Sequence, residues 1–196
     1  MKRILLLVAA LLLLALLPGA LTEGELRPAP EGWVNIGWIE GGISLAVPDD
    51  FEQSYILPEY ADMGIVILGG DADFMLQLRR FAPETLNYAE FLAMVEAQPG
   101  AEVSVRMDGE VEIAEYRNTT PDSDSELYGV ILTGLDGCLY KVSVFTGDDG
   151  AFADDAPVWT IAETLGASVH LVDFSGWGIP EQELRQPEAN RNDRNK

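Results

Sequence analysis

Cysteine, histidine and basic residues are all scarce in this sequence of 196 residues. It contains one cysteine, Cys138, and one histidine, His170. A single cysteine excludes an intramolecular disulfide, and a chain of this length can fold on a hydrophobic core without one. Zinc sites draw on several His or Cys ligands, so zinc and Cys-His or Ser-His catalysis find little support. We expect Cys138 to be a buried apolar residue and His170 to have a structural role.

Basic residues are outnumbered by acidic ones, 12 against 33, which gives a formal net charge of −21. Nucleic-acid binding depends on neutralising phosphates with Lys and Arg, so this composition argues against a nucleic-acid partner. The charged residues after position 180 cancel one another, and the excess of acid therefore lies before that position. An acidic surface keeps a protein soluble, and any partner that it attracts is cationic.

Long apolar runs are also missing, apart from one at the N-terminus. Lys2 and Arg3 precede an apolar run over residues 4–17, and Pro18, Gly19 and Ala20 follow it. This order is typical of a secretory signal peptide, so we predict a signal over residues 1–20 and a secreted or cell-envelope location. The alternative is an uncleaved anchor, although a spanning helix needs about 20 apolar residues. No cysteine follows the run, which excludes lipid attachment there.

The rest of the chain divides by composition into three parts. Residues 21–31 are polar with two prolines and are expected to form a linker. Residues 32–180 have the length and apolar content of a single acidic domain, which we expect to be a monomer. Residues 181–196 are polar, charged and rich in Asn, and we expect this tail to be disordered.

Strand patterns in the domain occur in pairs that are separated by turn residues, which predicts four hairpins. The strongest turn signal is Asp108-Gly109 in the third pair. The predicted pairs are residues 33–38 with 42–47, 65–68 with 74–81, 103–107 with 111–116, and 127–133 with 139–145. Residues 51–63 show no regular pattern and are expected to form an irregular connection or one helical turn.

Two helices are predicted from apolar stripes at helical spacing. The first begins after Asn87, which can form a capping box with Glu90, and ends before Pro99. In the second, Pro157 lies in the first turn and Gly166 is the expected end. Four strands, a helix, four strands and a helix define an α+β fold. We therefore expect an α/β/α sandwich in which two helices cover a mainly antiparallel sheet of hairpins.

One segment resembles a known family. Residues 42–51, Gly-Ile-Ser-Leu-Ala-Val-Pro-Asp-Asp-Phe, are similar to the opening segment of the PsbP-like superfamily, which includes photosystem II extrinsic proteins and bacterial DcrB-type envelope proteins. The helix after Asn87, the two hairpins behind it and the last helix match that group's order over residues 33–172. The resemblance implies the same sandwich fold and a non-enzymatic accessory or binding role. No functional residue transfers, because the basic docking surface of the photosystem proteins and the lipid-bearing Cys of the DcrB type are both missing.

Acidic clusters are the candidate metal sites. Calcium requires six to eight converging oxygens. Asp122, Asp124 and Glu126 imitate the start of an EF-hand loop, but the glycine and the final glutamate of that motif are missing. The loop 147–155 is the better candidate, and its possible ligands are Asp148, Asp149, Asp154 and Asp155. The last two can instead cap the second helix.

These features lead to one functional prediction and two alternatives. We predict an exported accessory module that binds a protein or peptide without catalysis and without a cofactor. A calcium- or small-solute-binding protein that uses loop 147–155 is the first alternative. A carboxylate-based hydrolase is the second, more remote one, since no pair of acids has a distinctive spacing.

Overall fold

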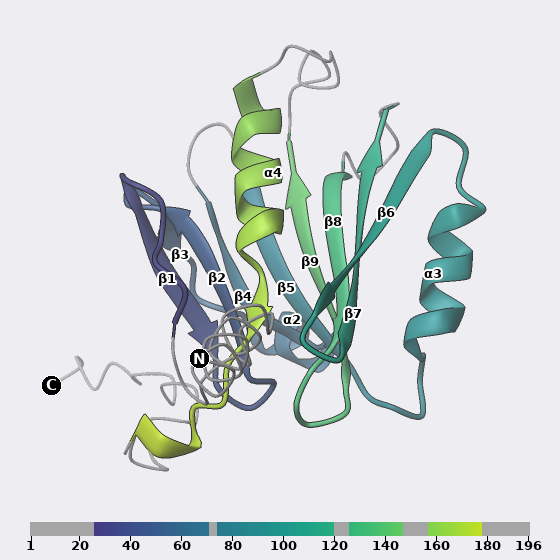
Figure 1. The fold of residues 1–196 in the computed structure, drawn as a ribbon, viewed down its shortest axis with the longest axis horizontal. Coiled ribbons are helices and arrows are strands. Elements are labelled where there is room, and N and C mark those ends of the chain that lie inside the picture. Colours follow the sequence, from purple (N-terminus) through teal and green to yellow (C-terminus); the bar gives the residue numbers. More distant parts are fainter. Residues whose placement is uncertain (1–25, 71–73, 120–125, 147–156, 178–196) are drawn as a thin grey trace, which may run out of the picture.

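The structure is a computed structural model that describes residues 26–70, 74–119, 126–146 and 157–177. Two antiparallel sheets and two longer helices dominate it (Figure 1). The strands are β1 (Trp33–Trp38), β2 (Ile43–Pro48), β3 (Glu52–Gln53), β4 (Ile65–Gly70), β5 (Met75–Phe81), β6 (Ala101–Asp108), β7 (Val111–Asn118), β8 (Glu126–Thr133), β9 (Leu139–Phe145) and β10 (His170–Leu171). The helices are α2 (Pro58–Asp62), α3 (Tyr88–Glu96), α4 (Pro157–Ser168) and a 3-10 turn, η2 (Ser175–Trp177).

Seven strands form the main sheet, in the order β3-β4-β5-β9-β8-β7-β6. The neighbouring strands all pair antiparallel, as expected for strands that are joined by hairpins. The four predicted hairpins are therefore confirmed, as β1–β2, β4–β5, β6–β7 and β8–β9. The irregular stretch before β4 contains the short strand β3 and the single helical turn α2.

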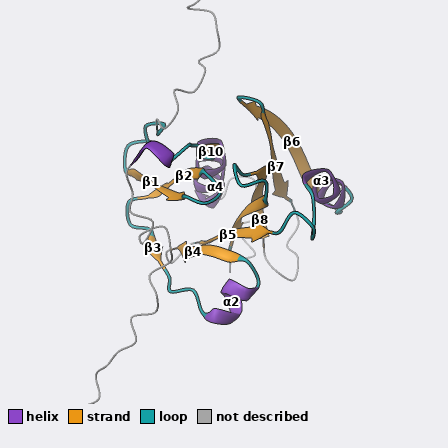
Figure 2. Ribbon diagram, turned by 90° about the horizontal axis from the view of Figure 1, so that it is seen from below, coloured by secondary structure: helices purple, strands orange, loops and turns teal. Residues whose placement is uncertain are grey.

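The first hairpin does not join the main sheet. β1 and β2 form a separate three-stranded sheet with β10, in the order β1-β2-β10. β2 is buried over residues 43–47, with Ile43, Leu45 and Val47 in the main apolar core. Figure 2 shows the main sheet curving around α4 and this small sheet, with α3 on its outer side. The α+β sandwich that the sequence predicts is thus present, with a second small sheet beside α4.

Each face of the main sheet has its own apolar core. Val158, Ala162 and Leu165 of α4 pack in the larger cluster with β2 and with the inner face of β8. Val95 of α3 packs in the smaller cluster with Ile131 of β8 on the outer face. Because side chains alternate along a strand, β8 contributes to both clusters. This arrangement fixes α3 and α4 on opposite faces of the sheet.

The predicted limits of the helices are only partly correct. The capping box of α3 is confirmed, since Asn87 accepts a hydrogen bond from Glu90 N and the Glu90 carboxylate accepts one from Asn87 N. The prediction that Gly166 ends α4 is wrong, because the helix continues to Ser168. A Cβ atom at Gly166 would lie 2.3 Å from the Tyr128 hydroxyl oxygen. The glycine is needed for close packing of helix on sheet, rather than for a helix end.

Candidate functional site

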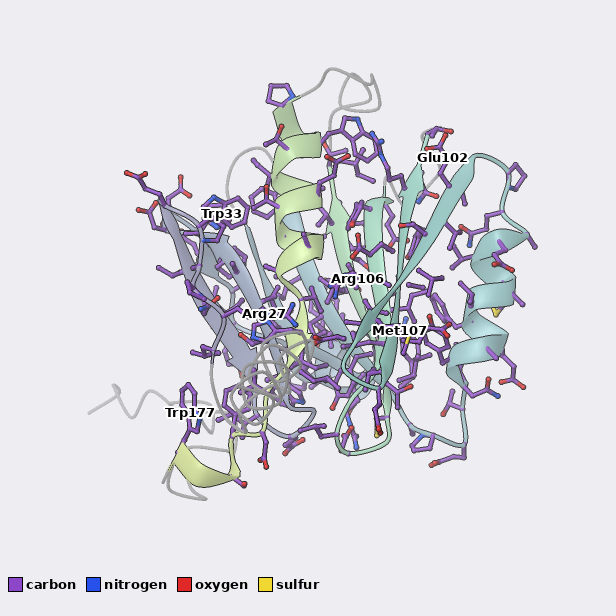
Figure 3. All side chains as sticks on the ribbon, in the orientation of Figure 1. Arg27, Trp33, Glu102, Arg106, Met107 and Trp177 are labelled. Atoms are coloured by element: carbon purple, nitrogen blue, oxygen red, sulfur yellow. The ribbon has the colours of Figure 1, made fainter. Side chains whose placement is uncertain are left out.

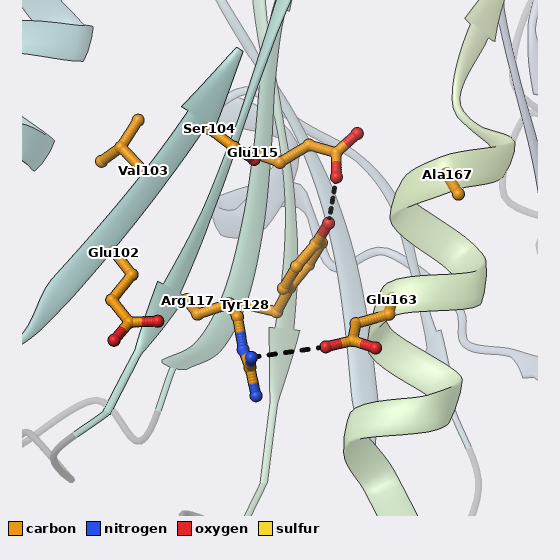
Figure 4. Close-up of a pocket in the computed structure, with 8 residues that line it drawn as sticks. All are labelled: Glu102, Val103, Ser104, Glu115, Arg117, Tyr128, Glu163 and Ala167. Atoms are coloured by element: carbon orange, nitrogen blue, oxygen red, sulfur yellow. Dashed lines mark hydrogen bonds and ion pairs between the residues drawn. The ribbon is translucent and has the colours of Figure 1, made fainter. Parts of the chain in front are cut away.

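A cleft of about 480 Å³ lies on the inner face of the main sheet, between β6 and α4 (Figure 4). β7 and β8 supply Glu115, Arg117 and Tyr128. The flanking elements supply Glu102, Val103 and Ser104 from β6 and Glu163 and Ala167 from α4. The cleft is open to solvent, its lining mixes charged and apolar groups, and it contains three carboxylates.

The side-chain repeat of each element places these residues on the faces that line the cleft, with a period of two in the strands and a spacing of four in the helix. Glu115 and Arg117 are two positions apart on β7, so they share the inner face, whereas Tyr116 between them packs in the outer core. Glu163 and Ala167 are four positions apart on α4 and lie on one side of the helix. Close packing of Gly166 against the Tyr128 ring fixes the spacing between α4 and β8.

A chain of hydrogen bonds connects three strands at one end of the cleft. The Tyr128 hydroxyl donates to Glu115 Oε2 over 2.6 Å, and Arg106 Nε donates to Glu115 Oε1 over 2.5 Å. Arg106 Nη2 also donates to the main-chain oxygens of Gly166 and Val169, over 3.1 and 2.7 Å. Arg106 thus ties β6 to the carboxyl end of α4, where a cation is favoured by the exposed carbonyls.

Burial changes the pKa of Tyr128 in this network. Desolvation raises the pKa of the Tyr128 phenol well above its usual range, and the hydrogen bond to the Glu115 carboxylate adds to the effect. Tyr128 therefore stays protonated and remains a donor to Glu115 at any physiological pH. Arg106, Glu115 and Tyr128 thus hold one another in place by hydrogen bonds along this side of the cleft.

Arg117 forms the other end of the cleft. Its guanidinium lies 4.2 Å from the centroid of the Trp159 ring, and its Nη1 is 3.5 Å from Glu163 Oε1. Its Nε atom is buried and finds no acceptor among the described residues. The cation–π contact holds Arg117 against α4. The Glu163 side chain stays 54% exposed, so its carboxylate can also reach a bound partner.

Glu102 differs from the other two carboxylates of the cleft. It is exposed at the start of β6, and within the described chain it forms no ion pair. Glu115 is neutralised by Arg106, and Glu163 is partly neutralised by Arg117. The cleft therefore retains a negative charge at its β6 side. Chemically, this arrangement suits the binding of a cationic group.

The sequence predictions of metal ligands fall almost entirely outside the described residues. Asp148, Asp149, Asp154 and Asp155 all lie there, and so do Asp122 and Asp124. Glu126 is described, and it is buried with its carboxylate bonded to Tyr116 and Lys141. Over residues 26–70, 74–119, 126–146 and 157–177, no three His, Cys, Asp or Glu side chains gather as a metal site would require.

Cys138 and His170 are both buried, at 2% and 1% exposure. Burial raises the pKa of the Cys138 thiol and lowers the pKa of His170. His170 Nδ1 lies 2.7 Å from the main-chain oxygen of Ser168, and its Nε2 accepts a hydrogen bond from Arg27 N over 3.4 Å. His170 thus connects the start of the described chain to β10, which agrees with the structural role expected from the sequence.

Sequence reasoning missed the cleft. Glu102, Glu115, Arg117 and Glu163 are scattered over 62 residues and belong to no motif. The one local signal is Glu115-Tyr116-Arg117, a charged pair that flanks an aromatic residue in a predicted strand. Such a pattern places opposite charges on one face, but it does not show that a helix lies over that face.

No helix within the described ranges has both the length and the apolar character that crossing a membrane requires.

The element order and the sheets described above form an α+β fold with the PsbP-like architecture. A solved structure that shares this fold is the solution structure of cyanobacterial PsbP (CyanoP) from Synechocystis sp. PCC 6803, with a TM-score of 0.50 and 15% sequence identity. The match covers 78% of this chain and 99% of the cyanobacterial protein. No protein-family model matches the sequence, and no curated protein matches it. The PsbP-like fold implied by the sequence is therefore confirmed.

Proposed function

We propose that this protein is exported and acts outside the cytoplasm as a monomeric, non-enzymatic accessory module that binds a protein or peptide partner. The observation that carries the proposal is the cleft between β6 and α4, whose side walls offer Glu102 and Glu163 to a partner. Three further features support it. The N-terminal residues have the order of a signal peptide, the fold is that of PsbP, and the surface is strongly acidic.

The arrangement of the cleft favours binding over catalysis. Glu115 is held on both carboxylate oxygens, by Arg106 and by Tyr128. A general acid or base must exchange its proton with substrate, and a carboxylate with both oxygens engaged by fixed donors is poorly suited to that task. Its role here is to hold β6, β7 and β8 in register around the cleft.

A charge-reversal pull-down tests the proposal. The exported protein and the variant Glu102→Arg/Glu163→Arg are used as bait in an extract of the cell envelope. We expect a partner that binds the parent protein and is lost with the variant. Glu59→Arg/Asp62→Arg on the exposed helix α2, at the other half of the main sheet, is the matched control and should retain the partner.

Two outcomes would contradict the proposal. Recovery of the same partners with the parent protein and with Glu102→Arg/Glu163→Arg would remove the cleft from the interaction. A rise in melting temperature with millimolar calcium, without any partner, would favour the alternative of a cation-binding protein.

Sequencing the N-terminus of exported protein tests the signal, since cleavage after Ala20 predicts a chain that begins at Leu21.

A further inference from the structure

Strand β6 forms one border of the main sheet. It follows β7 as the last strand in the order, and it is eight residues long. In the described part of the chain, no strand pairs with its outer side. A long open edge is a template for another strand, and proteins usually shorten, charge or cover such edges. β6 contains no proline, and its pairing with β7 continues without a bulge from Ala101 to Asp108.

The register of the β6–β7 hairpin shows which main-chain groups point outward. Asp108 pairs with Val111 around the two-residue turn Gly109–Glu110, so Asp108 directs its main-chain groups toward β7. Gly100 O, eight positions earlier, accepts a hydrogen bond from Thr119 N over 2.9 Å, in agreement with the same alternation. The intervening odd-numbered residues 103, 105 and 107 therefore direct their N–H and C=O groups away from the sheet.

The two faces of β6 differ in chemistry. On the outer face, Val105 and Met107 are 50% and 60% exposed. Figure 3 shows Met107 on the side of the sheet where α3 lies. On the inner face, Glu102 and Ser104 line the cleft opposite Glu163. A strand added at this edge would place alternate side chains on the two faces. One set would lie near the exposed apolar residues, and the other near the carboxylates of the cleft.

We infer that β6 binds an extended peptide segment with alternating basic and apolar side chains, which pairs with its open edge as an eighth strand of the sheet. Lysine or arginine side chains of this segment enter the cleft beside Glu102 and Glu163, and its apolar side chains cover Val105 and Met107. This inference rests on the proposed function and specifies its partner. Main-chain hydrogen bonds supply the affinity of such strand addition, and alternate side chains supply the specificity.

Charge decides between this occupant and a second copy of the same chain. Each of two copies that joined edge to edge would bring a formal net charge of −21 and a Glu102 that forms no ion pair within the described residues. Like charges disfavour that association, whereas a basic segment is attracted to the same surface. A peptide partner is therefore favoured over a homodimer.

The experiment uses an eight-residue peptide of alternating lysine and valine as the probe, with calorimetry on the full exported protein. Val105→Pro removes an outward N–H from β6 and leaves the ladder with β7 intact, since proline is tolerated at that side of an edge strand. We expect binding to fall by up to about tenfold, as the loss of one main-chain hydrogen bond implies. Val105→Thr keeps the N–H but replaces one methyl group of the apolar contact with a hydroxyl, so it should weaken binding less than Val105→Pro does.

Changes to the peptide keep the test valid if Val105→Pro fails to fold. The same peptide with methylated central backbone nitrogens cannot pair with a strand and should not bind the parent protein. A peptide of alternating glutamate and valine should not bind either. Glu102→Gln/Glu163→Gln should weaken binding of the lysine–valine peptide and reduce its salt dependence, whereas Glu59→Gln should change neither.

The outcomes separate this inference from the proposed function. Equal affinity of Val105→Pro and the parent, or binding of the methylated peptide, would show that the cleft binds without strand addition, and would overturn the inference alone. The inference alone would also be overturned if Glu102→Arg/Glu163→Arg lost the native partner but the parent protein did not bind the lysine–valine peptide. A dimer in ultracentrifugation that Val105→Pro dissociates would make a second copy the occupant and also overturn the inference.

Discussion

Strands β8 and β6 have the same length and are separated only by β7, but their surroundings are opposite. Seven of the eight residues of β8 are buried, with α4 on one face and α3 on the other. Only Asp108 is buried in β6. Because apolar burial is the main source of stability, the fold depends on the centre of the sheet, and its edge is available for a partner. The centre of the sheet thus stabilises the fold, and we propose its edge as the place where a partner binds.

The largest expected effect concerns the core around β8. Leu132→Ala removes a side chain that is fully buried in the larger cluster, and should lower the free energy of unfolding by about 2–5 kcal/mol. Val105→Ala on the exposed edge should lower it by less than about 1 kcal/mol. Urea denaturation measures both values. Equal losses for the two variants would show that β6 contributes to the core as β8 does.

Gly129 tests how closely the outer core is packed against β8. An alanine Cβ at this position would lie 2.2 Å from Cζ of Tyr116, whose ring is buried and whose hydroxyl donates to Glu126. Gly129→Ala should therefore destabilise the protein by about 1–3 kcal/mol. Gly176→Ala, which has nothing within 4 Å of its Cβ, should stay within about 0.5 kcal/mol of the parent. Thermal denaturation compares the pair, and equal stabilities would contradict the tight packing.

Arg106 is the link between the edge and the core. Arg106→Met removes its hydrogen bonds to Glu115, Gly166 and Val169, and should cost about 1.5 kcal/mol of stability. Hydrogen exchange should become faster in β6 and at the end of α4, and remain unchanged in β5 and β9. Arg79→Met, which removes an exposed hydrogen bond to Met63, is the control. Unchanged exchange in β6 would mean that the edge is held by its pairing with β7 alone.

The smallest effect is a pH dependence at Tyr128. Desolvation raises the pKa of this phenol in the folded protein, so the unfolded chain releases the proton first once the pH exceeds about 10. Stability is therefore complete below pH ~10 and falls as the pH rises above it, by at most about 1.4 kcal/mol per pH unit for this group. Melting temperatures from pH 8 to 11 should fall less steeply for Tyr128→Phe than for the parent. The exposed Tyr55→Phe should follow the parent curve, and identical curves for all three would exclude Tyr128 as the cause.

Local patterns predict most elements of this fold, because the interactions that define them lie within a few residues. The third hairpin turn and the capping box of Asn87 and Glu90 are both local, and both are found in the structure, with the turn at Gly109–Glu110, one position after the Asp108-Gly109 signal. The prediction for the end of α4 is wrong because the role of its glycine depends on a contact with a distant residue. Gly166 looks like a helix end in sequence, and only its packing against Tyr128, 38 positions away, shows why a glycine is there.

No local sequence pattern predicts the candidate site. Arg106, Glu115 and Tyr128 belong to three strands, and nothing in the sequence shows that they form one hydrogen-bonded chain. The separate sheet of β1, β2 and β10 was equally hidden, because β10 is only two residues long and follows α4. Strand order and the curvature of the sheet decide both features.

The sequence by itself determined the composition of the surface, the hairpins and helices, and the α+β class, since charge and periodicity can be read residue by residue. Tertiary structure alone decided which strand ends the sheet, which face α4 covers, and which carboxylates meet in the cleft. The physical reason is that these features depend on contacts between distant segments. β6 reads in sequence as one strand among several, and only the strand order makes it an open edge beside Glu102 and Glu163.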